Sequence, residues 1–259
     1  MPALIPICAL FGLLIGSFLN VVIARVPDGR SIVRPASACP RCAHELGWWE
    51  NIPILSWLLL RAKCRSCRLP ISARYPLVEA LGAVLFALVA WRVGWHAVLP
   101  AVLFFTAASV ALAFIDLDTR RLPNRIVFTT QAAVGVGLVG AALAEHRPGK
   151  LVGVAVGALA ASGFLFVLHV IKPAGMGFGD VKYAVAIGAV LGWWGIGTVV
   201  VGVLAGFFIG SIVGVAQAAR AGKLRGATMP FGPALAMGAL VGILWGARIV
   251  DWDQGLLGS

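Results

Sequence analysis

The chain's strongest chemical signal is an aspartate placed between alternating glycines and a long apolar run. Glycines occupy every second position of the stretch Gly175–Gly179, Asp180 follows, and Lys182 precedes the apolar residues 183–191. Glycine accepts backbone conformations closed to other residues and leaves room for a second chain to approach. A carboxylate at the mouth of a membrane helix is costly unless it is paired, hydrated or neutralised. Asp180 therefore needs a partner.

The candidate partners are few. Of the 10 acidic residues, only Asp116 and Asp118 also stand at the edge of a hydrophobic span and beside a basic loop. If both are helical, their side chains point about 200° apart. One of them can then face Asp180 while the other meets Arg120, Arg121 or water. The residues alone leave open which of the two it is.

Two carboxylates in one site predict acid–base chemistry. They cannot both ionise easily, so one keeps a proton near neutral pH while the other stays charged. The charged group can draw a proton from an attacking water and the protonated one can polarise a peptide carbonyl, as in aspartic proteases. Two alternatives remain on the residues alone: an ion-coupled transporter or channel that uses the carboxylates as a cation site, and structural pairing with Lys182 or Arg120.

Four cysteines predict a metal site. Cys39 and Cys42 form one C-x2-C hook, Cys64 and Cys67 form a second, and 21 residues separate them. Two such hooks can supply four thiolates to one tetrahedral zinc ion. Two disulfides are the alternative, but the basic character of residues 25–75 places them in the cytoplasm, where thiols stay reduced. A redox role is less favoured because no thioredoxin-like pattern surrounds either pair.

The elements that position these groups are membrane spans. The 259-residue chain is 60% hydrophobic and only 12% charged, against about 25% charged in soluble domains. We expect an all-α polytopic membrane protein with three parts: a first transmembrane helix at 1–24, a cytoplasmic zinc segment at 25–75, and a helical bundle at 76–259 that carries the aspartates. A span needs about 20 apolar residues, which predicts about eight spans near 3–24, 76–95, 97–115, 125–144, 151–171, 182–198, 199–217 and 231–250.

The basic residues set the orientation. Seventeen of the 21 lysines and arginines fall on the side that holds residues 25–75, 116–124, 172–181 and 218–230. Because basic loops face the cytoplasm, this side is expected to be cytoplasmic, with Asp116, Asp118 and Asp180 at its membrane surface. The formal charge of +11 is then a property of these loops. We expect membrane lipids, and no nucleic acid, as partners.

Glycines also predict a packing face. Gly202, Gly206, Gly210 and Gly214 recur every four residues along the seventh expected span. Such a stripe lets a second helix approach closely.

The motifs together resemble a known family. In chain order the chain is similar to the type IV prepilin peptidases, which are bifunctional leader peptidases and N-methyltransferases, and its GxGD pattern is similar to that of presenilin-type intramembrane proteases. The similarity covers nearly the whole chain and is carried by the following segments: Gly16–Val22, the two cysteine hooks, Asn51–Trp57, Arg74–Glu79, Asp116 with Pro123 and Asn124, Gly177–Lys182, and Pro230–Pro233.

The resemblance implies a function. It selects Asp116, which has a proline seven residues later, and Asp180 as the catalytic pair, and leaves Asp118 auxiliary. The implied substrates are prepilins and pseudopilins, cut after a basic leader at the cytoplasmic face of the cell inner membrane. The new N-terminus would be methylated from S-adenosylmethionine, an activity associated in the family with the cysteine-bearing segment. A non-catalytic zinc scaffold is a third hypothesis, beside the peptidase and the transporter.

Overall fold

The computed structural model describes residues 2–173, 176–221 and 230–257. Gly175 of the glycine motif lies outside these ranges, as do Lys223, Arg225 and Thr228 of the segment 218–230 that is expected to be cytoplasmic. Within them the chain is helical, with isolated two-residue bridges in the cysteine segment. Seven helices are long and apolar enough to cross a membrane, at Leu4–Arg25, Arg74–Val93, Leu99–Thr119, Asn124–Ala144, Lys150–Ile171, Ile196–Ala219 and Gly232–Trp252. The chain is a multi-pass membrane protein, as predicted.

The chain divides into two compact units, Met1–Trp91 and Arg92–Ser259. The first contains α1 (Leu4–Arg25), a 3-10 turn (Trp48–Asn51), the short α2 (Leu55–Leu59) and most of α3 (Arg74–Val93). The second contains α4 (Leu99–Thr119), α5 (Asn124–Ala144), α6 (Lys150–Ile171), α7 (Phe178–Gly192), α8 (Ile196–Ala221), α9 (Gly232–Val241) and α10 (Ala247–Leu257).

In the first unit, α1 and α3 pack through small residues. A methyl group on Gly16 would lie 2.7 Å from the Glu79 Cα, and the backbones meet again at Gly12 and Gly82. Asn20 Nδ2 donates a hydrogen bond of 3.2 Å to the Tyr75 carbonyl. The first-span motif and the Arg74–Glu79 motif, which lie far apart in the sequence, are therefore neighbours because glycine allows the two backbones to touch.

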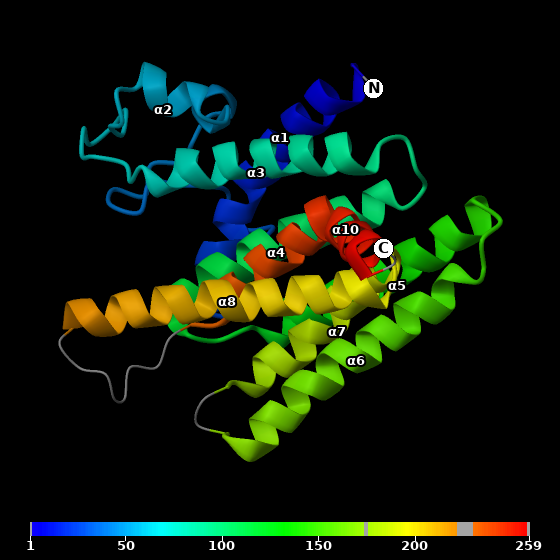
Figure 1. Cartoon of the computed structure of the whole chain (residues 1–259). Helices are drawn as coiled ribbons and strands as arrows, with labels where there is room; N and C mark the ends of the chain where they lie inside the picture. Colours follow the sequence, from blue (N-terminus) through cyan, green and yellow to red (C-terminus); the bar gives the residue numbers. More distant parts are fainter. Residues whose placement is uncertain (1, 174–175, 222–229, 258–259) are drawn as a thin grey trace. The chain divides into compact units, whose positions relative to one another are not determined.

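In the second unit, α7 is the central helix. It packs against α4, α5, α6, α8 and α9, and α6 runs along it (Figure 1). Its 15 residues span roughly 22 Å at the helical rise, less than the hydrocarbon thickness, so the expected span 182–198 is a short buried helix. The chain breaks at Trp193–Gly195, where Gly195 has a φ of +118°, and α8 begins at Ile196. A boundary was expected beside this point.

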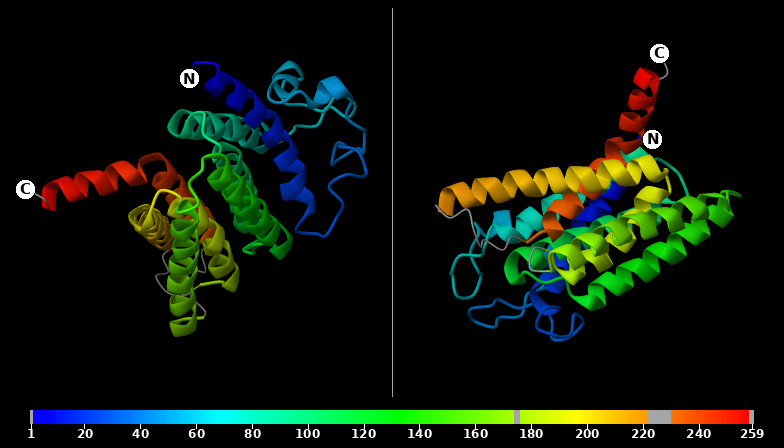
Figure 2. Two further views of the ribbon diagram at one scale, coloured as in Figure 1. Left: turned by 90° about the vertical axis from the view of Figure 1, so that its right-hand side faces the viewer. Right: turned by 60° about the horizontal axis from the view of Figure 1, so that its bottom comes forward.

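Two further elements complete this unit. Gly206 and Gly210 of α8 face the start of α9, where added methyl groups would meet Ala234 and Phe231, and one on Gly202 would meet Leu191 of α7 and then Gly238 of α9. These three positions form a packing face, as predicted. The last span begins as α9, passes through a π-helical turn (Gly242–Gly246) and continues as α10. Figure 2 shows α10, in red, turning away from α8, as expected where a π-turn interrupts the helical ladder.

Candidate active site and metal centre

Asp116 lies in the last turn of α4. The helix continues to Thr119, beyond the expected end at 115, and Arg120 ends it in a left-handed conformation with a φ of +53°. The Asp116 side chain is buried, and its Oδ2 accepts a hydrogen bond of 2.9 Å from the Gly232 backbone N–H. That N–H belongs to the first residue of α9, where backbone donors have no helical partner and suit a carboxylate.

Asp180 lies in the first turn of α7. Its Oδ2 accepts a hydrogen bond of 3.2 Å from the N–H of Gly177, the residue that caps this helix. A carboxylate three residues into a helix commonly reaches back in this way. Asp180 is also buried, so both aspartates are withdrawn from the surface and held by the start of a helix.

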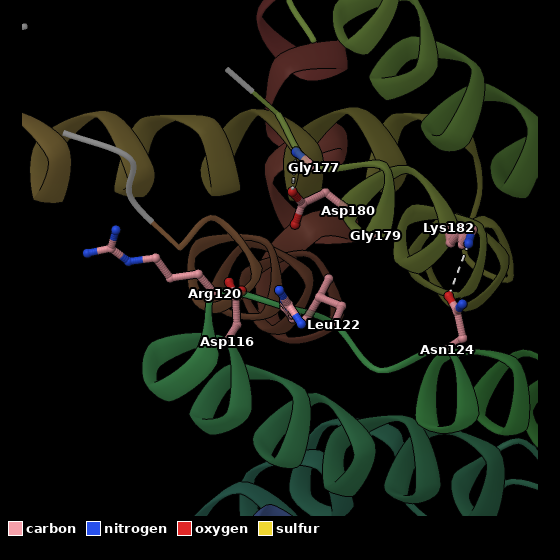
Figure 3. A pocket seen from close by; sticks show the side chains of 9 residues that line it. Asp116, Arg120, Leu122, Asn124, Gly177, Gly179, Asp180 and Lys182 are labelled. Carbon is pink, nitrogen blue, oxygen red and sulfur yellow. Dashed lines mark hydrogen bonds between the residues drawn. The ribbon is translucent and has the colours of Figure 1, made fainter. Parts of the chain in front are cut away.

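The two carboxyl groups share one cavity. It has a volume of about 320 Å³ and is lined by the following residues: Asp116, Arg120, Arg121, Leu122, Asn124, Gly177, Gly179, Asp180 and Lys182. Figure 3 shows both carboxyl groups reaching into the space between α4 and the start of α7. The structure thus brings together Asp180 and Asp116, which are 64 positions apart in the chain.

Asp118 points elsewhere. It is exposed while Asp116 is buried, since positions two apart on a helix lie on nearly opposite faces. It does not line the cavity. The structure therefore separates the two candidates that the sequence pattern left open.

The glycines of the motif make room for the protein's own atoms. A methyl group on Gly179 would lie 3.1 Å from the Leu122 Cβ, and one on Gly177 would lie 3.3 Å from the Asp180 Oδ2. At Gly232 a methyl group would lie 2.9 Å from the Asp116 Oδ2. We expected space for a second backbone at Gly177 and Gly179. Instead, Leu122 and the Asp180 carboxylate occupy it.

Lys182 is held beside the cavity by α5. Its Nζ donates a hydrogen bond of 3.0 Å to the Asn124 Oδ1 and lies 5.5 Å and 5.0 Å from the ring centroids of Phe128 and Phe178. Gln131 Nε2 also donates to the Lys182 carbonyl, at 2.6 Å. These contacts join the start of α5 to the start of α7. Leu122 lies in the loop that leads into α5.

Four of the five cysteines of the first unit, Cys39, Cys42, Cys64 and Cys67, form one cluster. Their sulfur atoms all lie within 4.8 Å of one another. The closest pairs join the two hooks, with Sγ–Sγ distances of 4.0 Å for Cys39 and Cys67 and 3.9 Å for Cys42 and Cys64. These cysteines are free thiols. A tetrahedral ion with metal–sulfur bonds of about 2.3 Å requires sulfur separations of about 3.8 Å, so the cluster can hold one metal ion.

The two hooks have the same local fold. The N–H of each first cysteine donates to a carbonyl five residues later, at His44 and Leu69 respectively. The residue after each second cysteine, Ala43 or Arg68, has a positive φ. In the first hook, the N–H groups of Arg41 and Cys42 point at the Cys39 sulfur and lower the pKa of its thiol to about 6, which favours the thiolate that metals bind.

His44 does not join the cluster. Its Nε2 lies 3.4 Å from the Oε2 of the buried Glu50, which also accepts a hydrogen bond of 2.8 Å from the Gly47 N–H. The Gly47 N–H, and then His44, lower the pKa of the Glu50 carboxyl. The cluster therefore consists of thiols, as the sequence predicted. Cys8 is buried in α1 and lies outside the cluster.

Comparison with known proteins identifies the family to which the chain belongs. The bacterial peptidase A24 N-terminal domain matches residues 10–93, and the type IV leader peptidase family matches residues 103–216. The prepilin leader peptidase/N-methyltransferase of Neisseria gonorrhoeae is 37% identical over 285 residues, which cover 97% of this chain and 95% of that protein. The chain belongs to the type IV leader peptidase family.

Other members of the leader peptidase family are similarly close. The prepilin leader peptidase/N-methyltransferase of Aeromonas salmonicida strain A449 is 38% identical over 275 residues, 94% of this chain and 91% of that protein. The protein of the same name in Myxococcus xanthus is 48% identical over 194 residues, 73% of this chain and 57% of the relative. No solved structure matches the chain significantly.

Sequence reasoning missed three parts of the site. The Pro230–Pro233 motif carried no role, yet Gly232 contacts Asp116. Leu122 carried no predicted role, and neither did the hydrogen bond between Lys182 and Asn124. One signal was present: a glycine followed by proline at the start of a helix marks a first turn with a free N–H. The partner of that N–H is set by tertiary packing.

Proposed function

We propose that this leader peptidase family member is a membrane aspartic endopeptidase with Asp116 and Asp180 as its catalytic pair, and that it removes the leader of type IV prepilins and pseudopilins. The observation that supports it best is the single cavity that holds both carboxyl groups. The substrate class is inferred from the relatives, each of which is a prepilin leader peptidase/N-methyltransferase.

The reaction needs one charged and one protonated carboxyl group. The charged group accepts a proton from a water molecule, whose oxygen attacks the carbonyl carbon of the scissile peptide. The protonated group donates its proton to the carbonyl oxygen, which gives a neutral tetrahedral diol. The proton taken from water then passes to the departing nitrogen as the C–N bond breaks, and one hydroxyl of the diol returns a proton to the other carboxylate. The leader leaves with a carboxyl end and the mature protein with a free amine.

Burial supports Asp116 over Asp118 in this role. A carboxyl group that shares a site with Asp180 has to lie in the same cavity, and Asp116 does. The N–H groups of Gly177 and Gly232 each hold one oxygen and leave the other available. Fixed donors of this kind keep a catalytic group in one orientation through the reaction.

The metal of the cysteine cluster is proposed to be zinc in a structural role. Four thiolates around one ion leave no open position, which is typical of structural zinc sites. Cys39, Cys42, Cys64 and Cys67 would hold it, and it would fix the fold of the segment 25–75. Such short segments rarely bury enough apolar surface to fold without help.

Methylation of the new N-terminus is proposed from the relatives' names and the resemblance. The methyl donor would be S-adenosylmethionine. The described residues offer no glycine-rich loop of the kind common in methyltransferases, so we assign no residue to that donor and derive no step through it.

The cytoplasmic side of the inner membrane is the proposed location of both sites. The distribution of basic residues supports it. In that orientation the chain would comprise a first span at 1–24, the zinc segment at 25–75 and the catalytic bundle at 76–259. A cysteine introduced at Thr228 should resist a membrane-impermeant thiol reagent added from outside. Labelling from outside would reverse this topology.

A peptide assay tests the function directly. Purified protein is mixed with a prepilin-like peptide, and the product masses are read with and without S-adenosylmethionine. We expect two fragments in both cases, and one of them about 14 Da heavier when the donor is present. Intact peptide in both cases, with ion uptake by proteoliposomes, would favour the transporter instead. In cells, Asp180→Asn should leave the prepilin uncleaved.

A further inference from the structure

The short helix α2 carries an apolar face that is exposed in the part of the chain that the structure describes. Leu55, Leu58 and Leu59 lie on one face of it, and the exposed fractions of these residues are 48%, 58% and 66%. The opposite side is fastened to the segment, since Trp57 Nε1 donates a hydrogen bond of 3.2 Å to the Ile71 carbonyl. A cluster of three exposed leucines on one helix face is unusual on a surface that meets only water.

A buried carboxylate places this face beside a membrane span. Glu79 lies five residues after the start of α3, at a depth of about 7.5 Å along the helix. Its Oε2 accepts a hydrogen bond of 2.7 Å from the Ile54 N–H, which begins α2. Because α3 is a membrane-spanning helix, the start of α2 is tied to a point inside the span. The cysteine-bearing segment 25–75 therefore lies close to the membrane at Ile54.

The charges next to α2 match a membrane surface. Between Glu50 and Glu79 the chain has no acidic residue and five basic ones, at Arg61, Lys63, Arg65, Arg68 and Arg74. Arg61 and Lys63 follow α2 directly and are exposed. Leucines on one face with basic residues beside them are typical of segments that lie in the interface between lipid headgroups and acyl chains.

We infer that α2 is an interfacial anchor: its three leucines insert among the acyl chains of the leaflet next to the cysteine segment, and the basic residues that follow bind anionic headgroups. Glu79 holds the anchor at that depth through the Ile54 N–H. The occupant of the leucine face is lipid, because the bond to Glu79 brings the face to the same leaflet that α3 crosses.

The anchor has a consequence for the cysteine cluster. Cys64 follows α2 by only a few residues, so the second hook begins where the anchor ends. The cluster is then held at the membrane surface by α2 as well as by α1 and α3. The segment 25–75 would then be embedded in one leaflet without crossing the membrane, in a protein whose other helices cross it.

Photo-crosslinking in a bilayer of known composition tests the anchor. The full chain is prepared with p-benzoyl-phenylalanine at position 59, and separately at position 33, and placed in nanodiscs of phosphatidylethanolamine and phosphatidylglycerol at a ratio of about 3 to 1. Val33 is the matched control because it is apolar, 78% exposed and part of the same segment, but outside α2. Adducts are identified by mass spectrometry after irradiation.

We expect phospholipid adducts at position 59 in at least five-fold excess over position 33, with phosphatidylglycerol enriched above its share of the bilayer. Equal yields at the two positions, or crosslinked protein dimers at position 59 without lipid adducts, would overturn the lipid assignment. Adducts that mirror the bulk composition would overturn the part assigned to Arg61 and Lys63. These outcomes do not depend on any folding-sensitive substitution.

A second variant tests the role of Glu79. Glu79→Ala removes the acceptor for the Ile54 N–H, and we expect the lipid adducts at position 59 to fall several-fold. Glu45→Ala is the control, since it removes an exposed carboxylate from the same segment and should leave the yield unchanged. An unchanged yield in Glu79→Ala would show that Glu79 does not hold the anchor.

Discussion

The cysteine cluster and the aspartate site are assembled in opposite ways. The four thiols lie within one stretch of the chain, Cys39–Cys67, and two similar turns present them. The aspartate site draws on the end of α4, the start of α7 and the start of α9, which lie far apart in the sequence. One site is a local structure that a metal can close, whereas the other exists only when the helices of the second unit are packed.

This difference predicts different failures. A change in the cluster should act on the folding of its own segment, because metal binding and folding are coupled there. A change in the aspartate site should act on the reaction and leave the fold intact, because α7 is fixed along its length by packing against five other helices. The predictions below test this separation, from the largest expected effect to the smallest.

Replacing either catalytic aspartate should have the largest effect. Asp116→Asn or Asp180→Asn removes an ionisable group while nearly keeping its shape, and we expect cleavage to fall at least about 10³-fold. The double variant should be no worse than either single one, since the two groups act as a unit. Peptide cleavage measured by mass spectrometry checks this, with bound metal as the measure of an intact first unit.

Asp118→Asn is the matched control for this prediction. The side chain lies two residues from Asp116 but is exposed and outside the cavity, so we expect activity within about three-fold of the parent. Loss of cleavage in Asp118→Asn alone would assign the role to the other carboxylate. Full activity in both Asp116→Asn and Asp180→Asn would rule out the aspartic mechanism.

Loss of the metal should unfold the cysteine segment and leave the aspartate site intact. We expect about one zinc ion per chain, and Cys64→Ser should lose it and make residues 25–75 sensitive to protease. Cys8→Ser changes a buried cysteine of the same unit that lies outside the cluster, and should keep the metal. Metal analysis and limited proteolysis measure both. A metal-free parent with two disulfides would contradict the prediction.

A methyl group at Gly232 should have an intermediate effect on the second site. In Gly232→Ala the new Cβ would lie 2.9 Å from the Asp116 Oδ2, so the carboxylate has to shift, and we expect cleavage to fall roughly 10- to 100-fold. Gly140→Ala is the control, because it adds a methyl group in open space on α5. Equal activity in the two variants would show that the contact does not position Asp116.

The bond between α5 and α7 should matter least. Asn124→Ala removes the acceptor for Lys182 Nζ, and a single exposed hydrogen bond contributes about 1 kcal/mol, so we expect a decrease of about two- to five-fold in kcat/KM. Thr129→Ala removes an exposed hydroxyl that donates to the Arg125 carbonyl of the same helix and should change activity less. A larger loss in Thr129→Ala than in Asn124→Ala would refute this role.

The same contrast explains what the sequence could predict. The hook spacing was sufficient to predict the cysteine cluster, because turn geometry over five residues brings each pair of thiols together. Hydrophobic runs predicted about eight spans, one more than the seven helices that are long enough to cross a membrane. A composition window could not show that residues 178–192 form a short helix surrounded by others, since a buried helix and a membrane span are both apolar all round. Helical periodicity separated Asp116 from Asp118 without choosing between them. The partner of Gly232 depends on how α9 meets α4, which no local pattern encodes.

The seam between α6 and α7 has a consequence for how a substrate enters. The backbones of Gly153 and Gly157 touch those of Gly192 and Gly188, so an added methyl group at any of these glycines would overlap the opposing backbone. Two helices joined this closely travel as one rigid body. Asp180 lies on α7, so we expect it to keep its position relative to α6 when a substrate enters the cavity.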